Sequence, residues 1–307
     1  MLSIIAKSGL RVFAKNDAQT KNLSRSFVGL PTQTCLGARG TGLTRRRVLH
    51  GGAAAGAALL LTGRRAAAAV SMEEAIAGLL AGRKATPSGR IAIEVPQAFN
   101  YGITVPLGIA VDSPMTREDH VRSVHVFADG NPFPEVVSLH FAPGSGPARA
   151  TTRFRLDSGK HLIWAAAELS DGSVLTATSE VSVVIGGCDK DSGIAPNTPE
   201  PEPVPRVKLP ERAGRGDLVE VLSHIAHRME TGLRADTAGN PLPRRIIHRM
   251  ECRYAGRVVF AAELSPAIAA NAYFGFPMRA VEEGDVAFAW HEDGGAVYRA
   301  TQHIAVD

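Results

Sequence analysis

The chain has 307 residues, 45% of them hydrophobic and 21% charged, which is typical of a packed protein with room for two ordinary domains. Its basic pI of about 9.1 suggests a nucleic-acid partner, but the basic residues gather at one end. Residues 1–69 hold 11 Lys and Arg against the single acid Asp17, a net charge of +10. Residues 70–307 hold 23 Lys and Arg against 29 Asp and Glu, a net charge of −6. This main part therefore lacks the basic surface that binds phosphates, which excludes a nucleic-acid function.

Residues 1–69 have the features of an export signal. Arg45 and Arg46 stand in the sequence Thr-Arg-Arg-Arg-Val-Leu, followed by an apolar run over residues 51–61 and then by four alanines. This order predicts a cleaved signal, and the paired arginines resemble a twin-arginine signal, which places the protein in the periplasm. The apolar run is too short to span a bilayer. A mitochondrial transit peptide is the alternative, because residues 1–43 are basic and nearly free of acids.

The next segment predicts one short helix followed by strands. Residues 72–82 place Ile76, Leu79 and Leu80 on one side of an amphipathic helix. From residue 91 onward, apolar and polar residues alternate between turn signals such as Asp171-Gly172. Seven strands are predicted, at 91–95, 103–111, 121–126, 136–141, 151–156, 162–167 and 174–185. Short strands without alternating helices are typical of a β-sandwich.

Residues 186–205 interrupt this pattern. They begin with Gly-Gly-Cys and end in a Pro/Glu run that is expected to be extended and solvated. A second strand-rich block follows, with strands predicted at 218–224, 245–254, 257–263, 285–291 and 297–306. The sequence therefore predicts an all-β protein of two β-sandwich domains, residues 70–185 and 206–307, joined by a flexible Cys-bearing linker and preceded by a short helix.

Cys188 is the residue best suited to carry chemistry. Gly186 and Gly187 precede it, so the thiol has no bulky neighbour on that side and a freely rotating backbone. That arrangement suits a nucleophile that must enter a narrow pocket on another protein. The carboxylates of Asp189 and Asp191 oppose formation of the thiolate, so a strongly activated catalytic cysteine is not expected.

Other cysteines and histidines leave alternatives open. Cys35 departs with the signal, which leaves Cys252 to form a disulfide with Cys188 or to serve as a small core residue in a strand. His224, His227 and His248, with Glu230, suggest a metal site, but their spacing fits no structural zinc pattern. We expect residues 227–232 to shape a turn at the domain interface, and we expect no metal, no cofactor and no enzymatic centre.

Several motifs in both blocks indicate a known family. In the first block they are Phe99-Asn-Tyr-Gly-Ile-Thr-Val-Pro106, Asn131-Pro-Phe-Pro134, Thr152-Arg-Phe-Arg-Leu156 and Val183-Val-Ile-Gly-Gly-Cys188. In the second they are His227-Arg-Met-Glu-Thr-Gly-Leu-Arg234, Asn240-Pro-Leu-Pro-Arg-Arg-Ile246 and Leu264-Ser-Pro-Ala-Ile-Ala-Ala-Asn-Ala-Tyr273. On these motifs the first block resembles the Y subunit of the sulfur-oxidation (Sox) carrier, and the second resembles its Z subunit.

The resemblance implies two immunoglobulin-like domains, packed face to face, in a non-catalytic carrier. By this resemblance Cys188 holds thiosulfate-derived sulfur for periplasmic sulfur-oxidising enzymes, and Gly186 and Gly187 give the arm its mobility. The family's arm ends Gly-Gly-Cys-Gly-Gly at a free terminus, whereas here Asp189-Lys190-Asp191 follows the cysteine and the linker tethers the arm at both ends. The fused arrangement resembles SoxY–SoxZ fusions found beside quinoprotein dehydrogenases. The alternative is therefore an adaptor of such a dehydrogenase, in which Cys188 carries no sulfur.

Overall fold

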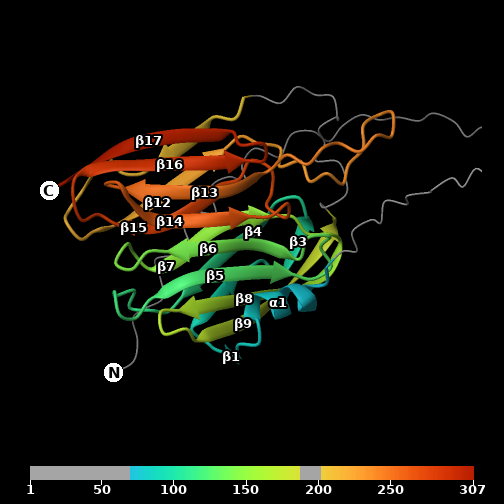
Figure 1. The fold of residues 1–307 in the computed structure, drawn as a ribbon, viewed down its shortest axis with the longest axis horizontal. Coiled ribbons are helices and arrows are strands. Elements are labelled where there is room, and N and C mark those ends of the chain that lie inside the picture. The colour runs from blue at the N-terminus through green and yellow to red at the C-terminus, as the bar shows by residue number, and fades with distance from the viewer. Residues whose placement is uncertain (1–69, 187–201) are drawn as a thin grey trace, which may run out of the picture. The chain divides into compact units, whose positions relative to one another are not determined.

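The computed structural model describes residues 70–186 and 202–307, all of which belong to one compact unit, Arg64–Asp307 (Figure 1). The protein is all-β, as predicted, with one short helix at the start of this unit. No helix among these residues is long and apolar enough to cross a membrane. The elements are α1 (Met72–Leu80), β1 (Ala85–Pro87), β2 (Ile91–Glu94), β3 (Ala98–Tyr101), β4 (Val105–Val111), β5 (Val121–Ala128), β6 (Glu135–Phe141), β7 (Ala148–Phe154), β8 (Gly159–Leu169), β9 (Val174–Ile185), β10 (Pro205–Lys208), β11 (Arg212–Ala213), β12 (Leu218–Ile225), β13 (Ile247–Tyr254), β14 (Arg257–Leu264), β15 (Tyr273–Arg279), β16 (Gly284–Glu292) and β17 (Val297–Val306).

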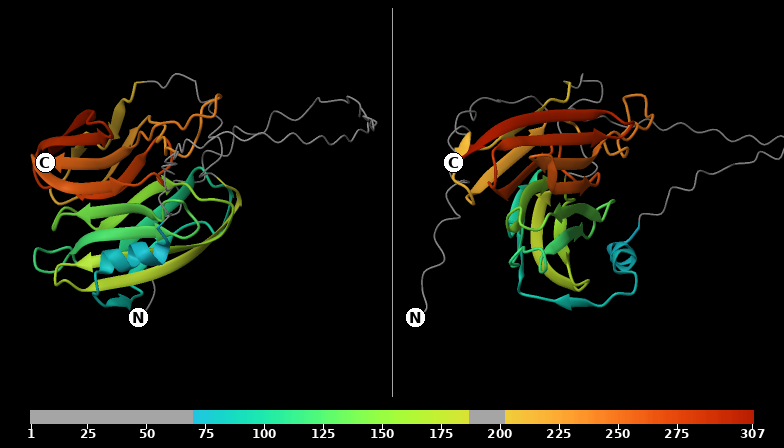
Figure 2. Two further views of the ribbon diagram at one scale, coloured as in Figure 1. Left: turned by 45° about the vertical axis from the view of Figure 1, so that its right-hand side comes forward. Right: turned by 60° about the vertical axis from the view of Figure 1, so that its left-hand side comes forward.

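Helix α1 is defined by its caps. The Ser71 hydroxyl accepts a hydrogen bond from the Glu74 N–H, and the Glu74 carboxylate accepts one from the Ser71 N–H, which satisfies two free donors of the first turn. Ala81 adopts a left-handed conformation with φ of 46°, which ends the helix two residues earlier than predicted. The helix lies beside the first half of the protein in every view (Figures 1 and 2).

Two sheets run through both halves of the protein. The larger sheet has the order β1-β9-β8-β5-β6-β14-β13-β16-β17-β11, with β3 paired to β9. The smaller sheet has the order β10-β12-β15-β7-β4-β2. Strands β1 to β9 form the first half and strands β10 to β17 form the second, so each sheet contains strands of both.

The two halves join edge to edge, and the predicted face-to-face packing is wrong. Strand β6 pairs with β14 from Val137↔Leu264 to Phe141↔Phe260, and β7 meets β15 at Thr151↔Gly275 (Figure 1). An unpaired sheet edge exposes a row of backbone N–H and C=O groups, and this pairing removes such an edge from each half. The fusion thereby gains backbone hydrogen bonds that face-to-face packing would not supply.

The core continues across this joint. Phe141 of the first half lies 5.5 Å from Phe260 of the second, measured between ring centroids, and Phe260 in turn stacks on Phe276 at 4.2 Å. Phe260 and Phe276 are almost completely buried. Because aromatic side chains bury large areas, these contacts stabilise the joint together with the strand pairing.

Most predicted strands are present, although the one expected at 151–156 lies at Ala148–Phe154 as β7. Strands β1, β3, β10, β11 and β15 were not predicted from the sequence. Strand β15 contains Gly275 and Pro277, which usually interrupt strands. Gly275 fits because a Cβ there would come within 2.8 Å of both Leu222 Cδ2 and Thr151 Oγ1.

Candidate functional site

The candidate site begins where β9 ends. Gly186 directly follows this strand, and Cys188 follows two residues later. Gly187 and Cys188 lie outside the described residues, as do Arg45 and Arg46, so the attachment and export roles of these residues stay predictions. The structure does describe residues 184–186, which we call the arm root.

Gly186 is buried against a turn of the first half. A Cβ on Gly186 would lie 2.2 Å from Asp157 Oδ1 and 2.7 Å from the Ser158 nitrogen. Both distances are below those that real Cβ atoms adopt, so this position requires glycine for close packing. The arm mobility predicted for Gly186 and Gly187 is not tested, but Gly186 itself is anchored by this packing.

The turn that holds Gly186 is itself well supported. The ring of His161 lies between two backbone carbonyl oxygens, with Nε2 at 2.8 Å from Asp157 O and Nδ1 at 2.9 Å from Asp129 O. Gly102 connects the turn to β9, because its N–H donates to Ile185 O at 2.7 Å and its carbonyl accepts from the Leu156 N–H at 2.7 Å. Gly102 therefore links Ile185, at the end of β9, to Leu156, next to the turn that holds Gly186.

Cys252 is a free, fully buried cysteine in β13, paired with Phe260 on one side and Phe288 on the other. Burial, and then the neighbouring Glu251 carboxylate, raise the pKa of its thiol. The prediction of a small core residue is confirmed, and the free thiol argues against a disulfide with Cys188. A protonated, buried thiol is a poor nucleophile.

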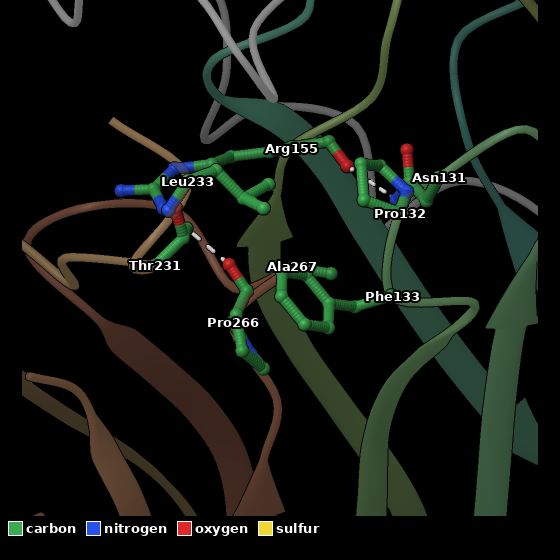
Figure 3. A pocket seen from close by; sticks show the side chains of 8 residues that line it. All are labelled: Asn131, Pro132, Phe133, Arg155, Thr231, Leu233, Pro266 and Ala267. Atoms are coloured by element: carbon green, nitrogen blue, oxygen red, sulfur yellow. Dashed lines mark hydrogen bonds between the residues drawn. The ribbon is translucent and has the colours of Figure 1, made fainter. Parts of the chain in front are cut away.

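Arg155 connects the arm root to the second half of the protein. Its buried guanidinium donates to Met229 O and Arg228 O at 2.8 Å each, and to Pro266 O at 3.3 Å. The Asn131 side chain donates to the Arg155 carbonyl at 2.9 Å (Figure 3). Arg155 lies two residues before Asp157, so one short segment contacts both the second half and the arm root. Arg155 belongs to the motif Thr152-Arg-Phe-Arg-Leu156, but nothing in its sequence context indicates this role.

A small cavity of about 10 Å³ lies between the halves beside Arg155 (Figure 3). Its wall combines residues of both, namely Asn131, Pro132, Phe133 and Arg155 with Thr231, Leu233, Pro266 and Ala267. These residues come from the same motifs that carry the family resemblance. The motifs therefore build the joint between the halves next to the arm root.

Among the histidines considered for a metal site, His227 has structural partners. The buried His227 ring lies with Nε2 2.8 Å from Glu292 Oε1, and its Nδ1 accepts from the Met229 N–H at 3.0 Å. Met229 has a positive φ of 55°, and Arg155 binds its carbonyl. The turn expected at residues 227–232 is thus part of the domain interface. Within residues 70–186 and 202–307, no group of three or more His, Cys, Asp or Glu is placed to hold a metal.

Two family models match the chain, one in each half. "Sulfur oxidation protein SoxY" matches residues 76–188, and "Sulphur oxidation protein SoxZ" matches residues 207–303. Together the two models match more than half of the chain. These matches and the all-β fold define a two-part protein of the sulfur-oxidation carrier class. The chain belongs to the SoxY and SoxZ families and is a fusion of the two.

Solved structures give more distant likenesses. The sulfur carrier protein SoxY from Chlorobium limicola f thiosulfatophilum is 23% identical with a TM-score of 0.32, over 38% of this chain and 97% of that one. A superoxide reductase (neelaredoxin) from Ignicoccus hospitalis is 18% identical with a TM-score of 0.28, over 30% of this chain and 79% of that one. No curated protein matches the chain.

Proposed function

We propose that this protein is a periplasmic carrier that holds a thiosulfate-derived sulfur substrate covalently on Cys188 for partner enzymes. The observation that carries the proposal is the SoxY match, which extends to Cys188 as its last residue. The packing of Gly186 supports the proposal, because Cys188 lies only two residues after this anchored glycine.

The attachment step requires an electron acceptor. The Cys188 thiolate and the outer sulfur of thiosulfate form a new S–S bond, which leaves a cysteine S-thiosulfonate and releases two electrons. The partner enzyme must accept these electrons, and a later partner must cleave the bound sulfur. The carrier's own task is to present the thiol and to keep it accessible.

Intact mass spectrometry of the periplasmic protein tests this function. We expect a mass addition after exposure to thiosulfate and cell extract, and its loss on treatment with a reductant. Cys188→Ser should abolish the addition, whereas the control Cys252→Ala should retain it, because Cys252 is fully buried. A chain that never acquires the addition contradicts the carrier function.

An adaptor of a periplasmic quinoprotein dehydrogenase is the second candidate. It is favoured by Asp189-Lys190-Asp191 after the cysteine and by the tether at both ends of the arm, since neither matches the family's free Gly-Gly terminus. An adaptor predicts that Cys188→Ser leaves dehydrogenase-dependent growth on alcohols unchanged, while deletion of the chain impairs it. A carrier predicts that both changes impair thiosulfate oxidation.

Export by the twin-arginine route is also part of the proposal. The paired arginines and the alanines near residue 69 predict cleavage close to Val70. N-terminal sequencing of periplasmic protein should begin there, and replacing Arg45 and Arg46 by lysines should retain the protein in the cytoplasm. Unimpaired export of that variant would contradict the proposed route.

A further inference from the structure

Strand β17 leaves much of one edge of the larger sheet unpaired. On one side it pairs with β16, from Gly284↔Ile304 to His291↔Val297. On the other side only β11 pairs with it, and only near its end, so residues 297–303 have no neighbouring strand there within the described part of the chain. β17 lies at the upper margin of the larger sheet in Figure 1. The strand near the opposite margin differs, because β1 and β3 cover both ends of β9.

The backbone of four residues faces this free edge. Along an antiparallel strand, successive residues direct their N–H and C=O groups alternately to one side and to the other. Ala305 donates to Glu211 O at 2.9 Å, on the side away from β16, so the other odd-numbered residues of β17 point the same way. These residues are Val297, Arg299, Thr301 and His303. No hydrogen bond from residues 70–186 or 202–307 reaches their edge-facing backbone groups.

The sequence of β17 does not protect this edge from another strand. Natural edge strands are usually short, or they carry proline, lysine or a bulge. Strands β1 and β10 follow this rule, since they have three and four residues and each contains a proline. β17 has ten residues, contains neither proline nor lysine, and pairs with β16 in an unbroken register. The edge of β17 is therefore open to pairing with an added strand.

We propose that the free edge of β17 pairs antiparallel with the same edge of a second copy of this chain, about a twofold axis at Ala300. In this register Arg299 lies opposite Thr301 of the other copy, and Val297 lies opposite His303 of the other copy. Every edge-facing residue then exchanges two N–H···O=C bonds with the residue opposite. The two copies of Ala300 meet at the axis, where their small side chains allow the strands to approach closely.

Charge selects this register over its neighbours. An axis at Arg299 would set two guanidinium groups opposite each other, and an axis at Thr301 would set Arg299 opposite His303. Hydrogen bonding to Asp285 raises the pKa of His303, which favours its positively charged form. Like charges directly opposite each other destabilise a strand pair. Only the axis at Ala300 avoids both of these contacts and still uses all four edge-facing residues.

This dimer keeps the arm root free. β9, which leads into the arm root, is separated from β17 by β8, β5, β6, β14, β13 and β16. At about 4.8 Å for each step between strands, the two strands lie about 34 Å apart along the sheet. Dimerisation is therefore independent of the carrier function, and a failure of one leaves the other standing.

Sedimentation velocity of the full chain measures this association, with a reductant present to remove disulfide-linked dimers. Pairing of one strand from each copy makes a small interface, so we expect a Kd of about 1–100 µM. Thr301→Pro removes an edge-facing N–H but none that bonds to β16, so it should raise the Kd about 10- to 100-fold while the circular dichroism spectrum stays parental. Thr301→Ala keeps the N–H and is the matched control, with an unchanged Kd.

Charged side chains at the same position test the register. Thr301→Glu sets a carboxylate opposite Arg299 of the other copy, twice by symmetry, and should lower the Kd about 2- to 30-fold, whereas Thr301→Lys should raise it by a similar factor. Neither change alters the backbone, so this pair decides the matter even where Thr301→Pro unfolds. A parent that stays monomeric up to about 200 µM, or equal Kd values for Thr301→Glu and Thr301→Lys, overturns the proposed pairing. So does a folded Thr301→Pro variant that dimerises like the parent.

Discussion

Replacing Gly186 by alanine tests whether the arm root is anchored. The new Cβ would lie 2.2 Å from Asp157 Oδ1 and 2.7 Å from the Ser158 nitrogen. The carboxylate of Asp157 can rotate away only by giving up its 3.2 Å hydrogen bond from the Ser158 N–H. The Ser158 nitrogen belongs to the main chain, so relief of the second contact requires the turn itself to shift.

The size of the effect follows from two opposing terms. Adding a methyl group to a closely packed position costs about 2–3 kcal/mol, while the lower entropy of the unfolded alanine chain returns about 0.4–1 kcal/mol. We therefore expect Gly186→Ala to lower the free energy of unfolding by about 1–2.6 kcal/mol. For a protein of this size, that corresponds to a fall in Tm of about 2–10 °C.

Thermal unfolding of three variants provides the assay. Gly89→Ala is the matched control, because Gly89 has no atom within 4 Å of its Cβ position and no positive φ. It should be neutral or slightly stabilising. Adding Asp157→Ala to Gly186→Ala removes the shorter contact and should recover part of the lost stability. Equal Tm values for Gly186→Ala and Gly89→Ala would refute an anchored arm root.

Three further changes probe the joint and the buried titratable groups. Arg155→Met should lower the free energy of unfolding, measured in urea, by about 3 kcal/mol, because three carbonyl oxygens of the second half lose the guanidinium donor. A loss below about 1 kcal/mol would contradict the role of Arg155 at the joint. Burial in the fold raises the pKa of the Cys252 thiol, so the stability that this thiol contributes is complete below about pH 8.5. Above that pH the contribution falls by about 1.4 kcal/mol per pH unit. The free energy of unfolding of Cys252→Ala, measured across pH 8–10, should lack this fall, and a fall equal to that of the parent would contradict the reasoning. The His125 ring lies between two serine hydroxyls, and burial lowers its pKa. The stability that the neutral ring confers is therefore present above about pH 6.5 and is lost as the pH falls. If the free energy of unfolding of His125→Gln fell with acid as steeply as that of the parent, this assignment would be contradicted.

The sequence by itself determined the kind of fold and the order of its parts. Period-two alternation predicted β4, β5, β8 and β9 close to their observed positions, because one face of each strand is buried in the core. The spacing of Ile76, Leu79 and Leu80 predicted helix α1, which begins at Met72 as expected. The strand context of Cys252 likewise predicted a core cysteine, since a buried face of a strand accommodates a small thiol.

Only the tertiary structure decided how the halves join and what holds the arm root. The edge pairing of β6 with β14 depends on backbone groups, which every residue carries, so no side-chain pattern announces it. The glycine-containing strand β15 is stable because its neighbours fill the space over Gly275, and that packing exists only in the folded protein. Arg155 stands in the sequence only as part of a motif, and Gly186 as part of a mobile arm, yet both are buried in the structure. Residues distant in the chain supply the carbonyl acceptors of Arg155 and the close-packed wall around Gly186.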